Sequence, residues 1–244
     1  MGRVILFVFA LFMAAGAAHA QPITLSAADG VKVYAHYWPA QARDAPLILA
    51  FHQAGASHAE YTPLAPRLNQ AGFSVLAIDQ RSGGNEFGGT NRTVAALGRS
   101  DSYDAALADL EAALAWGREH VAGARPIVWG SSYSAALVFV LAARHPTEVK
   151  AVLAFSPDEY LGNPEAVQQA ARTLKMPVFI DQATDGAEVA ASRALFDVIP
   201  GSAKTLFIAR TNGVHGAATL RDDRNAAGAA ENWAAVKAFL ATLK

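Results

Sequence analysis

The chain has 244 residues, of which 52% are hydrophobic and 17% charged, so it can bury a sizeable core and is not an intrinsically disordered protein. Its formal net charge of −1 gives no reason to expect nucleic acid or an anionic membrane surface as a partner. It contains no cysteine, which excludes disulfides, thiolate metal sites and a cysteine nucleophile.

The N-terminus has the form of a secretory signal peptide. Arg3 supplies a positive charge, residues 4–18 are apolar or small, and Ala18-His19-Ala20 fits a small-x-small cleavage site. The apolar run is short for a helix that spans about 30 Å of hydrocarbon. We therefore expect residues 1–20 to be removed. The mature chain, residues 21–244, is expected to be one exported domain in the periplasm or outside the cell, without membrane attachment.

The mature chain is predicted to start with an antiparallel hairpin. Two short alternating runs, residues 23–25 and 31–38, flank the turn signal Ala28-Asp29-Gly30. Near-continuous apolar runs follow, which are typical of strands buried on both faces of a parallel sheet. These runs cover residues 46–52, 73–79, 126–129, 149–155, 177–181 and 205–209.

Segments with helical spacing of apolar residues separate these runs. They cover residues 61–71, 103–120, 133–144, 189–196 and 229–243, with a short helix within 161–173. Residues 83–100 are glycine-rich and aperiodic, and we expect a long surface loop there. The alternation predicts an α/β fold with one doubly wound, mostly parallel sheet after the hairpin, and room for only a small lid. The sequence gives no indication of an oligomeric state.

One junction has the form of a nucleophile elbow. The apolar run Ile127-Val128-Trp129 ends in Gly130-Ser131-Ser132-Tyr133-Ser134 and passes directly into a helical segment. A G-x-S-x-G elbow places a serine at a sharp strand-to-helix turn, where only small neighbours fit. We therefore interpret Ser132 as a nucleophile and its two serine neighbours as packing positions.

Polar residues after the strand ends offer a base and an acid. A serine hydroxyl needs a base, and of the histidines only His52 and His215 follow strands, with His215 in a flexible loop suited to that role. A carboxylate should orient the base. Asp185 is our choice, with three competitors: Asp158, Asp181 and, more weakly, Glu188.

An oxyanion hole requires backbone N–H groups near the nucleophile. Tyr133, which follows Ser132, would supply one N–H group. The loop after the first parallel strand would supply the other, from Gln53 or Ala54. His52 would either support that loop by hydrogen bonding or be a satisfied core histidine.

These motifs together resemble the α/β-hydrolase fold serine hydrolases, and most closely the dienelactone-hydrolase-like and esterase group. The order Ser132, Asp185, His215 is the order of that fold's triads. The chain departs from the family at Gln53, where a glycine is usual, and at Ser134, which replaces the last glycine of the elbow. Dienelactone hydrolases themselves use a cysteine nucleophile.

The resemblance implies hydrolysis of a small-molecule carboxylic ester through an acyl-enzyme intermediate, without a cofactor or metal. A peptidase or thioesterase would use the same triad. A non-catalytic binding protein could also retain the scaffold.

Overall fold

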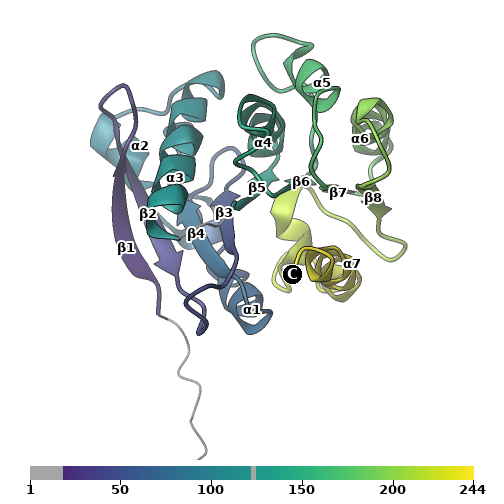
Figure 1. Ribbon diagram of the computed structural model, residues 1–244, viewed down its shortest axis with the longest axis horizontal. Coiled ribbons are helices and arrows are strands. Elements are labelled where there is room, and N and C mark those ends of the chain that lie inside the picture. Colours follow the sequence, from purple (N-terminus) through teal and green to yellow (C-terminus); the bar gives the residue numbers. More distant parts are fainter. Residues whose placement is uncertain (1–18, 122–124) are drawn as a thin grey trace, which may run out of the picture.

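The computed structural model describes residues 19–121 and 125–244. In these ranges an eight-stranded sheet has the strand order β1-β2-β4-β3-β5-β6-β7-β8 and carries helices on both faces (Figure 1). The predicted signal peptide lies outside the described residues, except for His19 and Ala20. No helix within the described ranges is long and apolar enough to cross a membrane.

The strands fall where the alternating and apolar runs predicted them. Their bounds are β1 Gln21–Ser26, β2 Lys32–Trp38, β3 Leu47–Phe51, β4 Ser74–Ile78, β5 Ile127–Ser131, β6 Ala151–Phe155, β7 Val178–Gln182 and β8 Lys204–Ile208. β1 pairs antiparallel with β2, and β2 pairs antiparallel with β4. All pairings among β3 to β8 are parallel, which confirms the predicted hairpin followed by a parallel sheet.

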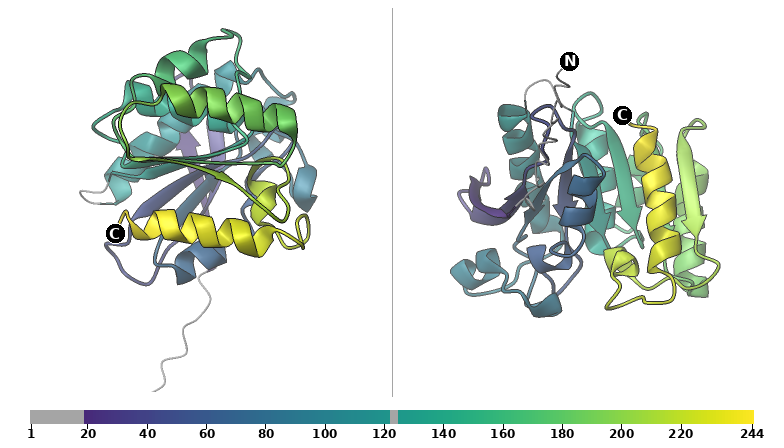
Figure 2. Two further views of the ribbon diagram at one scale, coloured as in Figure 1. Left: turned by 90° about the vertical axis from the view of Figure 1, so that its right-hand side faces the viewer. Right: turned by 90° about the horizontal axis from the view of Figure 1, so that it is seen from below.

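Helices cover the sheet in two layers. On one side lie α3 (Leu107–His120), α4 (Tyr133–Arg144), α5 (Ala166–Ala171) and α6 (Gly186–Val198). α1 (Ala65–Gln70) and α7 (Ala229–Ala241) lie on the other side (Figures 1 and 2). The sheet therefore has a hydrophobic cluster on each face.

The segment predicted as a long loop, residues 83–100, is partly helical. It contains a short 3₁₀ turn, η2 (Glu86–Gly88), and the helix α2 (Arg92–Leu97). Asn91 caps α2, because its side chain accepts the N–H of Val94 at 2.8 Å. Gly98 ends α2 in the left-handed conformation, with φ of 73°. The sequence pattern did not predict α2, because the helix is short and only one of its residues, Thr93, is buried.

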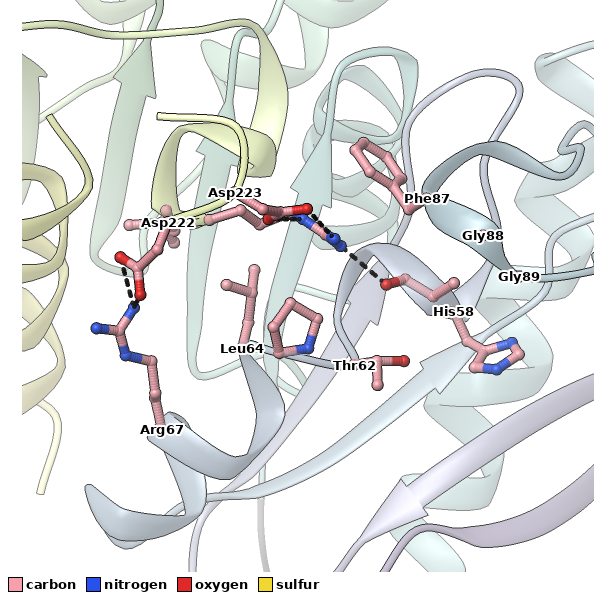
Figure 3. A pocket seen from close by; sticks show the side chains of 13 residues that line it. His58, Thr62, Leu64, Arg67, Phe87, Gly88, Gly89, Asp222 and Asp223 are labelled. Atoms are coloured by element: carbon pink, nitrogen blue, oxygen red, sulfur yellow. Dashed lines mark hydrogen bonds and ion pairs between the residues drawn. The ribbon is translucent and has the colours of Figure 1, made fainter. Parts of the chain in front are cut away.

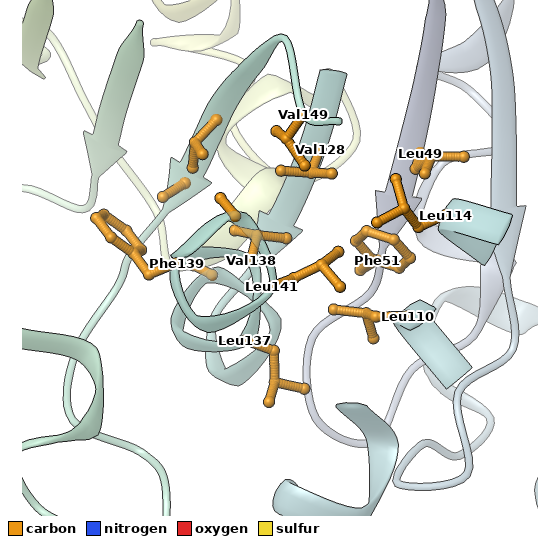
Figure 4. Packing of buried hydrophobic residues seen from close by; sticks show 14 of the residues in the cluster. Leu49, Phe51, Leu110, Leu114, Val128, Leu137, Val138, Phe139, Leu141 and Val149 are labelled. Carbon is orange, nitrogen blue, oxygen red and sulfur yellow. The ribbon is translucent and has the colours of Figure 1, made fainter. Parts of the chain in front are cut away.

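α4 is the most deeply packed helix of the larger cluster. Figure 4 shows Val138 and Leu141 of α4 facing Val128 of β5 and Phe51 of β3. These four side chains are fully buried, and each contributes roughly 1.5–3 kcal/mol relative to an exposed position. The close packing fixes the start of α4 relative to the ends of β3 and β5. The carboxyl ends of β3 and β5 to β8 share one edge of the sheet, where ligands bind in this class of fold.

Candidate active site

Ser132 occupies a strained turn between β5 and α4. Its backbone has φ of 59° and ψ of −125°, a conformation that costs about 1–3 kcal/mol for a residue with a side chain. The N–H of Ser132 donates to the carbonyl of Phe155 at 2.8 Å, and its carbonyl accepts the N–H of Ala135 at 2.7 Å. The neighbouring strand and the first turn of α4 thus hold the strained turn in place.

The small residues around Ser132 have separate steric reasons. A Cβ atom on Gly130 would lie 2.2 Å from the carbonyl oxygen of Ser134, so only glycine fits. Ser134, where the family has glycine, is fully buried. Its hydroxyl donates to the carbonyl of His52 and accepts from Gln80, both at 2.6 Å. Ser134 is therefore more than the packing position we expected, because it ties the elbow to the start of the loop after β3.

The structure brings Ser132 and His215 together. His215 lies between β8 and the 3₁₀ helix η4 (Gly216–Leu220), and its Nε2 is 2.8 Å from the Oγ of Ser132. The imidazole is 39% exposed, whereas Ser132 is 7% exposed. In this arrangement the serine hydroxyl can donate to Nε2, which is the geometry of a nucleophile and its general base.

The partner of the other ring nitrogen is Glu188, not Asp185. Nδ1 of His215 lies 2.9 Å from Oε1 of Glu188, which is in the first turn of α6. Asp185 is the N-cap of that helix, and its carboxylate accepts the N–H groups of Ala187 and Glu188 at 2.9 and 3.3 Å. The expectation that Asp185 orients His215 is thus wrong. Asp185 instead fixes the helix that carries Glu188.

The other two acidic competitors also lie away from His215. The exposed Asp158 accepts the N–H of its neighbour Glu159 at 2.7 Å. Asp181 is fully buried, and within the described part of the chain its carboxyl oxygens have no hydrogen-bond partner. Burial raises the pKa of Asp181 well above its usual value, because desolvation disfavours the charged form. Neither side chain can fix the orientation of the imidazole.

The electrostatics of the pair suit a general base. The hydrogen bond to Glu188 raises the pKa of His215 above its usual value, and burial opposes this rise only in part. Burial raises the pKa of Glu188, but the hydrogen bond from His215 outweighs it, so the net pKa is lowered. Glu188 is therefore a carboxylate near pH 7, which favours the tautomer of His215 with a proton on Nδ1.

Two backbone N–H groups are available for an oxyanion. In the described part of the chain, no hydrogen-bond partner is found for the N–H of Tyr133 or for that of Ala54. The N–H of Gln53 is occupied, because it donates to the buried carboxyl of Glu60 at 2.8 Å. Of the two residues expected in the loop after β3, the geometry thus leaves Ala54 free to donate.

His52 holds the loop after β3 from inside. Its Nδ1 lies 2.8 Å from the carbonyl of Gln53, and its Nε2 accepts the N–H of Gln80 at 3.0 Å. The ring is fully buried, and burial lowers the pKa of His52 to about 4. An imidazole that is neutral and hydrogen-bonded at both ring nitrogens supports the loop and is not placed to act as a base.

Tyr160, which the sequence analysis did not single out, also approaches the nucleophile. It follows β6, and its hydroxyl donates to the carbonyl of Ser156 at 3.4 Å. Burial raises the pKa of Tyr160 to about 12, so the phenol remains a neutral donor. No motif in the sequence distinguishes this tyrosine from the others.

Two cavities lie at this edge of the sheet. A cavity of about 530 Å³ is lined by Gln53, Glu86, Phe87, Val214, His215, Ala218 and Arg224, and it contains the base. A larger one of about 810 Å³ lies beside η1 (His58–Glu60) and is lined by His58, Arg67 and Phe87 among others, but by no member of the Ser132–His215–Glu188 set (Figure 3). Of these two cavities, the smaller one therefore borders His215.

Phe87 lines both cavities. Its backbone has φ of 61°, unusual for a residue with a large side chain. The guanidinium groups of Arg221 and Arg224 lie 4.6 and 5.0 Å from the ring centroid. These cation–π contacts help to hold the Phe87 ring in place.

As for metals, no three histidine, aspartate or glutamate side chains gather at a possible ion site in the described ranges.

Comparison with known proteins agrees with this fold. No curated protein shows significant sequence similarity to the chain. An esterase from Pyrococcus furiosus is similar in structure, with a TM-score of 0.68, 18% identity and 93% of each chain covered. A dienelactone hydrolase from Anabaena variabilis has a TM-score of 0.69 and 20% identity, covering 93% of this chain and all of the other.

A peptidase is also similar. The acylaminoacyl peptidase of Pyrococcus horikoshii has a TM-score of 0.57 and 13% identity over 79% of this chain, which corresponds to 36% of the peptidase. At these identities the likeness is one of fold. The sequence pattern of the α/β hydrolase fold family matches residues 46–181, more than half of the chain. The chain therefore belongs to the α/β hydrolase fold family.

Proposed function

We propose that the protein is a serine hydrolase that cleaves carboxylic esters, with Ser132 as nucleophile, His215 as general base and acid, and Glu188 as the carboxylate that orients His215. One observation carries the proposal: the Oγ of Ser132, on a strained turn, lies 2.8 Å from the Nε2 of a histidine whose Nδ1 is paired with a carboxylate. A strained backbone at a polar residue is a reason to infer function from geometry.

In the acylation step, Oγ of Ser132 attacks the ester carbonyl while its proton passes to Nε2 of His215. The N–H groups of Tyr133 and Ala54 donate to the oxyanion that forms on the carbonyl oxygen. Glu188 stabilises the imidazolium. The tetrahedral intermediate then collapses, and His215 returns the proton to the leaving alcohol, which leaves an acyl-enzyme on Ser132.

In the deacylation step, water replaces the alcohol. His215 takes a proton from water, hydroxide adds to the acyl carbonyl, and Ser132 leaves with the proton from His215. The products are a carboxylic acid and the regenerated enzyme.

The shape of the site favours small esters. Only α5 and short loops lie between β6 and β7, so little chain is available to form a lid. The cavity at His215 is small, about 530 Å³, and opens to solvent. Long acyl chains would lack a closed apolar channel to bury them.

Labelling with a fluorophosphonate and a substrate panel test the proposal. We expect one adduct on Ser132 in the folded protein and turnover that falls as the acyl chain of p-nitrophenyl esters lengthens. A folded protein without an adduct would point to a non-catalytic binding role. Faster turnover of thioesters or of N-acyl amino acid amides than of esters would indicate the thioesterase or peptidase alternative.

We also propose that the mature protein is exported to the periplasm or beyond. The charged, apolar and small-residue segments of residues 1–20 support this proposal. Expression of the full chain with a C-terminal tag, followed by fractionation and N-terminal sequencing, tests it. A mature form that starts at Gln21 in the exported fraction is expected, and an uncleaved protein in the cytoplasm would contradict it.

A further inference from the structure

A buried glutamate outside the proposed triad lies behind the nucleophile. Glu60, in η1, is fully buried. Its Oε2 accepts the N–H of Gln53 at 2.8 Å, and its Oε1 accepts the hydroxyl of Ser131 at 2.7 Å. Gln53 belongs to the loop that carries Ala54, and Ser131 directly precedes the nucleophile. One carboxylate therefore joins the oxyanion loop to the elbow.

The same connection continues to the loop of His215. The hydroxyl of Ser131 accepts the N–H of Ala217 at 2.8 Å, two residues after the base. Gly216 fits tightly between these groups, since a Cβ there would lie 2.4 Å from Oγ of Ser131 and 2.9 Å from Oε1 of Gln53. The guanidinium of Arg221 donates to the backbone carbonyl of Glu60 at 3.0 Å. Hydrogen bonds through the Glu60 carboxylate and the Ser131 hydroxyl thus connect the oxyanion loop, the elbow and the histidine loop, which are far apart in the sequence.

We propose that Glu60 is a positioning residue, whose carboxylate sets the oxyanion loop and the histidine loop relative to Ser132. This inference rests on the proposed function. Glu60 accepts the N–H of Gln53, so the N–H of the next residue, Ala54, remains available for the oxyanion. Displacement of a catalytic group by about 1 Å can cost about 10²-fold in rate, so the orientation of this loop matters.

The role predicts a dependence on the charge of Glu60. The carboxylate accepts at both oxygens, whereas a protonated group would turn a hydrogen toward one of the two donors and lose that hydrogen bond. Burial raises the pKa of Glu60 to about 7, and the hydrogen bonds from Ser131 and Gln53 limit the rise. Three other ionisable groups face it: Arg221, His215 and Tyr61. Activity should therefore increase as Glu60 ionises near neutral pH.

The test is the second-order rate constant for fluorophosphonate labelling of Ser132 between pH 5 and 9, which requires no knowledge of the substrate. The phosphonyl oxygen uses the same oxyanion donors as an ester. For Glu60→Gln we expect labelling at pH 8 to be roughly 10–100-fold slower than in wild type. On the acidic side of the pH profile, the labelling rate of this variant should rise less steeply and at a lower pH than in wild type. One ionisation is gone, and the charge of Glu60 no longer raises the pKa of His215.

Ser131→Ala provides a second variant that should move the profile the other way. It removes the hydrogen bond that limits the rise in the pKa of Glu60, so the labelling rate should begin to rise at a higher pH than in wild type. Asp181→Asn is the matched control. Asp181 is equally buried, but its carboxyl oxygens have no hydrogen-bond partner among the described residues, and so none in either loop of the site. Its replacement should therefore leave the labelling rate and profile of folded protein unchanged.

The outcomes separate the two proposals. If folded wild-type protein gives no Ser132 adduct, the proposed function fails and this inference fails with it. If wild type is labelled but Glu60→Gln and Ser131→Ala reproduce its rate and pH profile, only the role of Glu60 is overturned. A uniform drop in rate with an unchanged profile in both variants would also overturn it, because a purely structural effect lowers the fraction of active protein without moving an ionisation.

Discussion

Two of the histidine–carboxylate pairs in the described part of the chain have nearly the same geometry and different surroundings. Nδ1 of His215 lies 2.9 Å from Glu188, and Nδ1 of His58 lies 2.8 Å from Asp79. The first pair is 39% and 25% exposed, and the second is 14% and 1% exposed. Among the described residues, only the first pair has a serine hydroxyl beside the other ring nitrogen of its histidine.

The second pair is part of the framework. Asp79 follows β4 and also accepts the backbone N–H groups of His58 and Arg92, at 2.8 and 2.9 Å. The ring of His58 stacks on His36 with 3.8 Å between centroids. A histidine and a carboxylate in contact are therefore not a sign of catalysis. The pair at the candidate active site differs because His215 also contacts Ser132, which lies in a strained turn. This difference can be tested by substitution.

Removal of the nucleophile or base should have the largest effect. Ser132→Ala and His215→Ala should each lower kcat for a p-nitrophenyl ester by roughly 10⁴–10⁶-fold, because triad members act as a unit. The matched change in the framework pair, His58→Ala, should leave the rate per folded molecule within about threefold, since an interaction outside the site contributes to folding rather than to the transition state. Circular dichroism gives the folded fraction. A comparable loss in His58→Ala would contradict the distinction.

Replacement of the carboxylate should have the next largest effect. Glu188→Gln should lower kcat by about 10²–10⁴-fold, because the tautomer and imidazolium of His215 lose their stabilising charge. The base must be neutral to act, and Glu188 raises its pKa. The residual activity should therefore begin to rise at a lower pH than in wild type. A pH profile of kcat/KM checks the shift, and a shift to higher pH would exclude Glu188 as the partner.

The same change in the framework pair should affect stability instead. Asp79→Asn places an amide where three N–H groups point at a carboxylate, and it should lower the free energy of unfolding by about 1–3 kcal/mol. Urea denaturation measures this loss. kcat of the folded variant should be unchanged, and a pH profile altered like that of Glu188→Gln would show that the two pairs are not separate in function.

The smallest effect is expected at the helix cap beside Glu188. Asp185→Ala removes the cap of α6 and should cost about 0.5–2 kcal/mol in stability. The kcat of Asp185→Ala should fall far less than that of Glu188→Gln. The acidic side of its pH profile of kcat/KM should be the same as in wild type. If Asp185→Ala were the more damaging of the two, the sequence-based choice of acid would be restored.

The acid was misjudged from the sequence although a local signal existed. Asp185-Gly186-Ala187-Glu188 resembles a capping box, with an N-cap acceptor and a glutamate three residues later. An aspartate after a strand fits both a triad and a cap. Which side chain reaches His215 depends on the direction of α6 and on a loop more than twenty residues further along the chain, and neither can be read from local pattern.

The sheet and the elbow were easier to predict because their signals are local. Apolar runs mark β3 to β8, and Gly130 and Ser132 mark the turn after β5. Glu60 and Tyr160 could not be found this way. Glu60 is a charged residue within a polar segment, and only the tertiary structure shows that it is buried against Ser131 and Gln53.

The measurement that most directly tests the proposed triad is the rate of fluorophosphonate labelling in folded wild type, with the adduct mapped by mass spectrometry across pH 5 to 9. The triad of Ser132, His215 and Glu188 predicts one adduct, on Ser132. Its rate should rise with pH as His215 loses a proton at a pKa above its usual value. An adduct on any other residue, or none on folded protein, would contradict it.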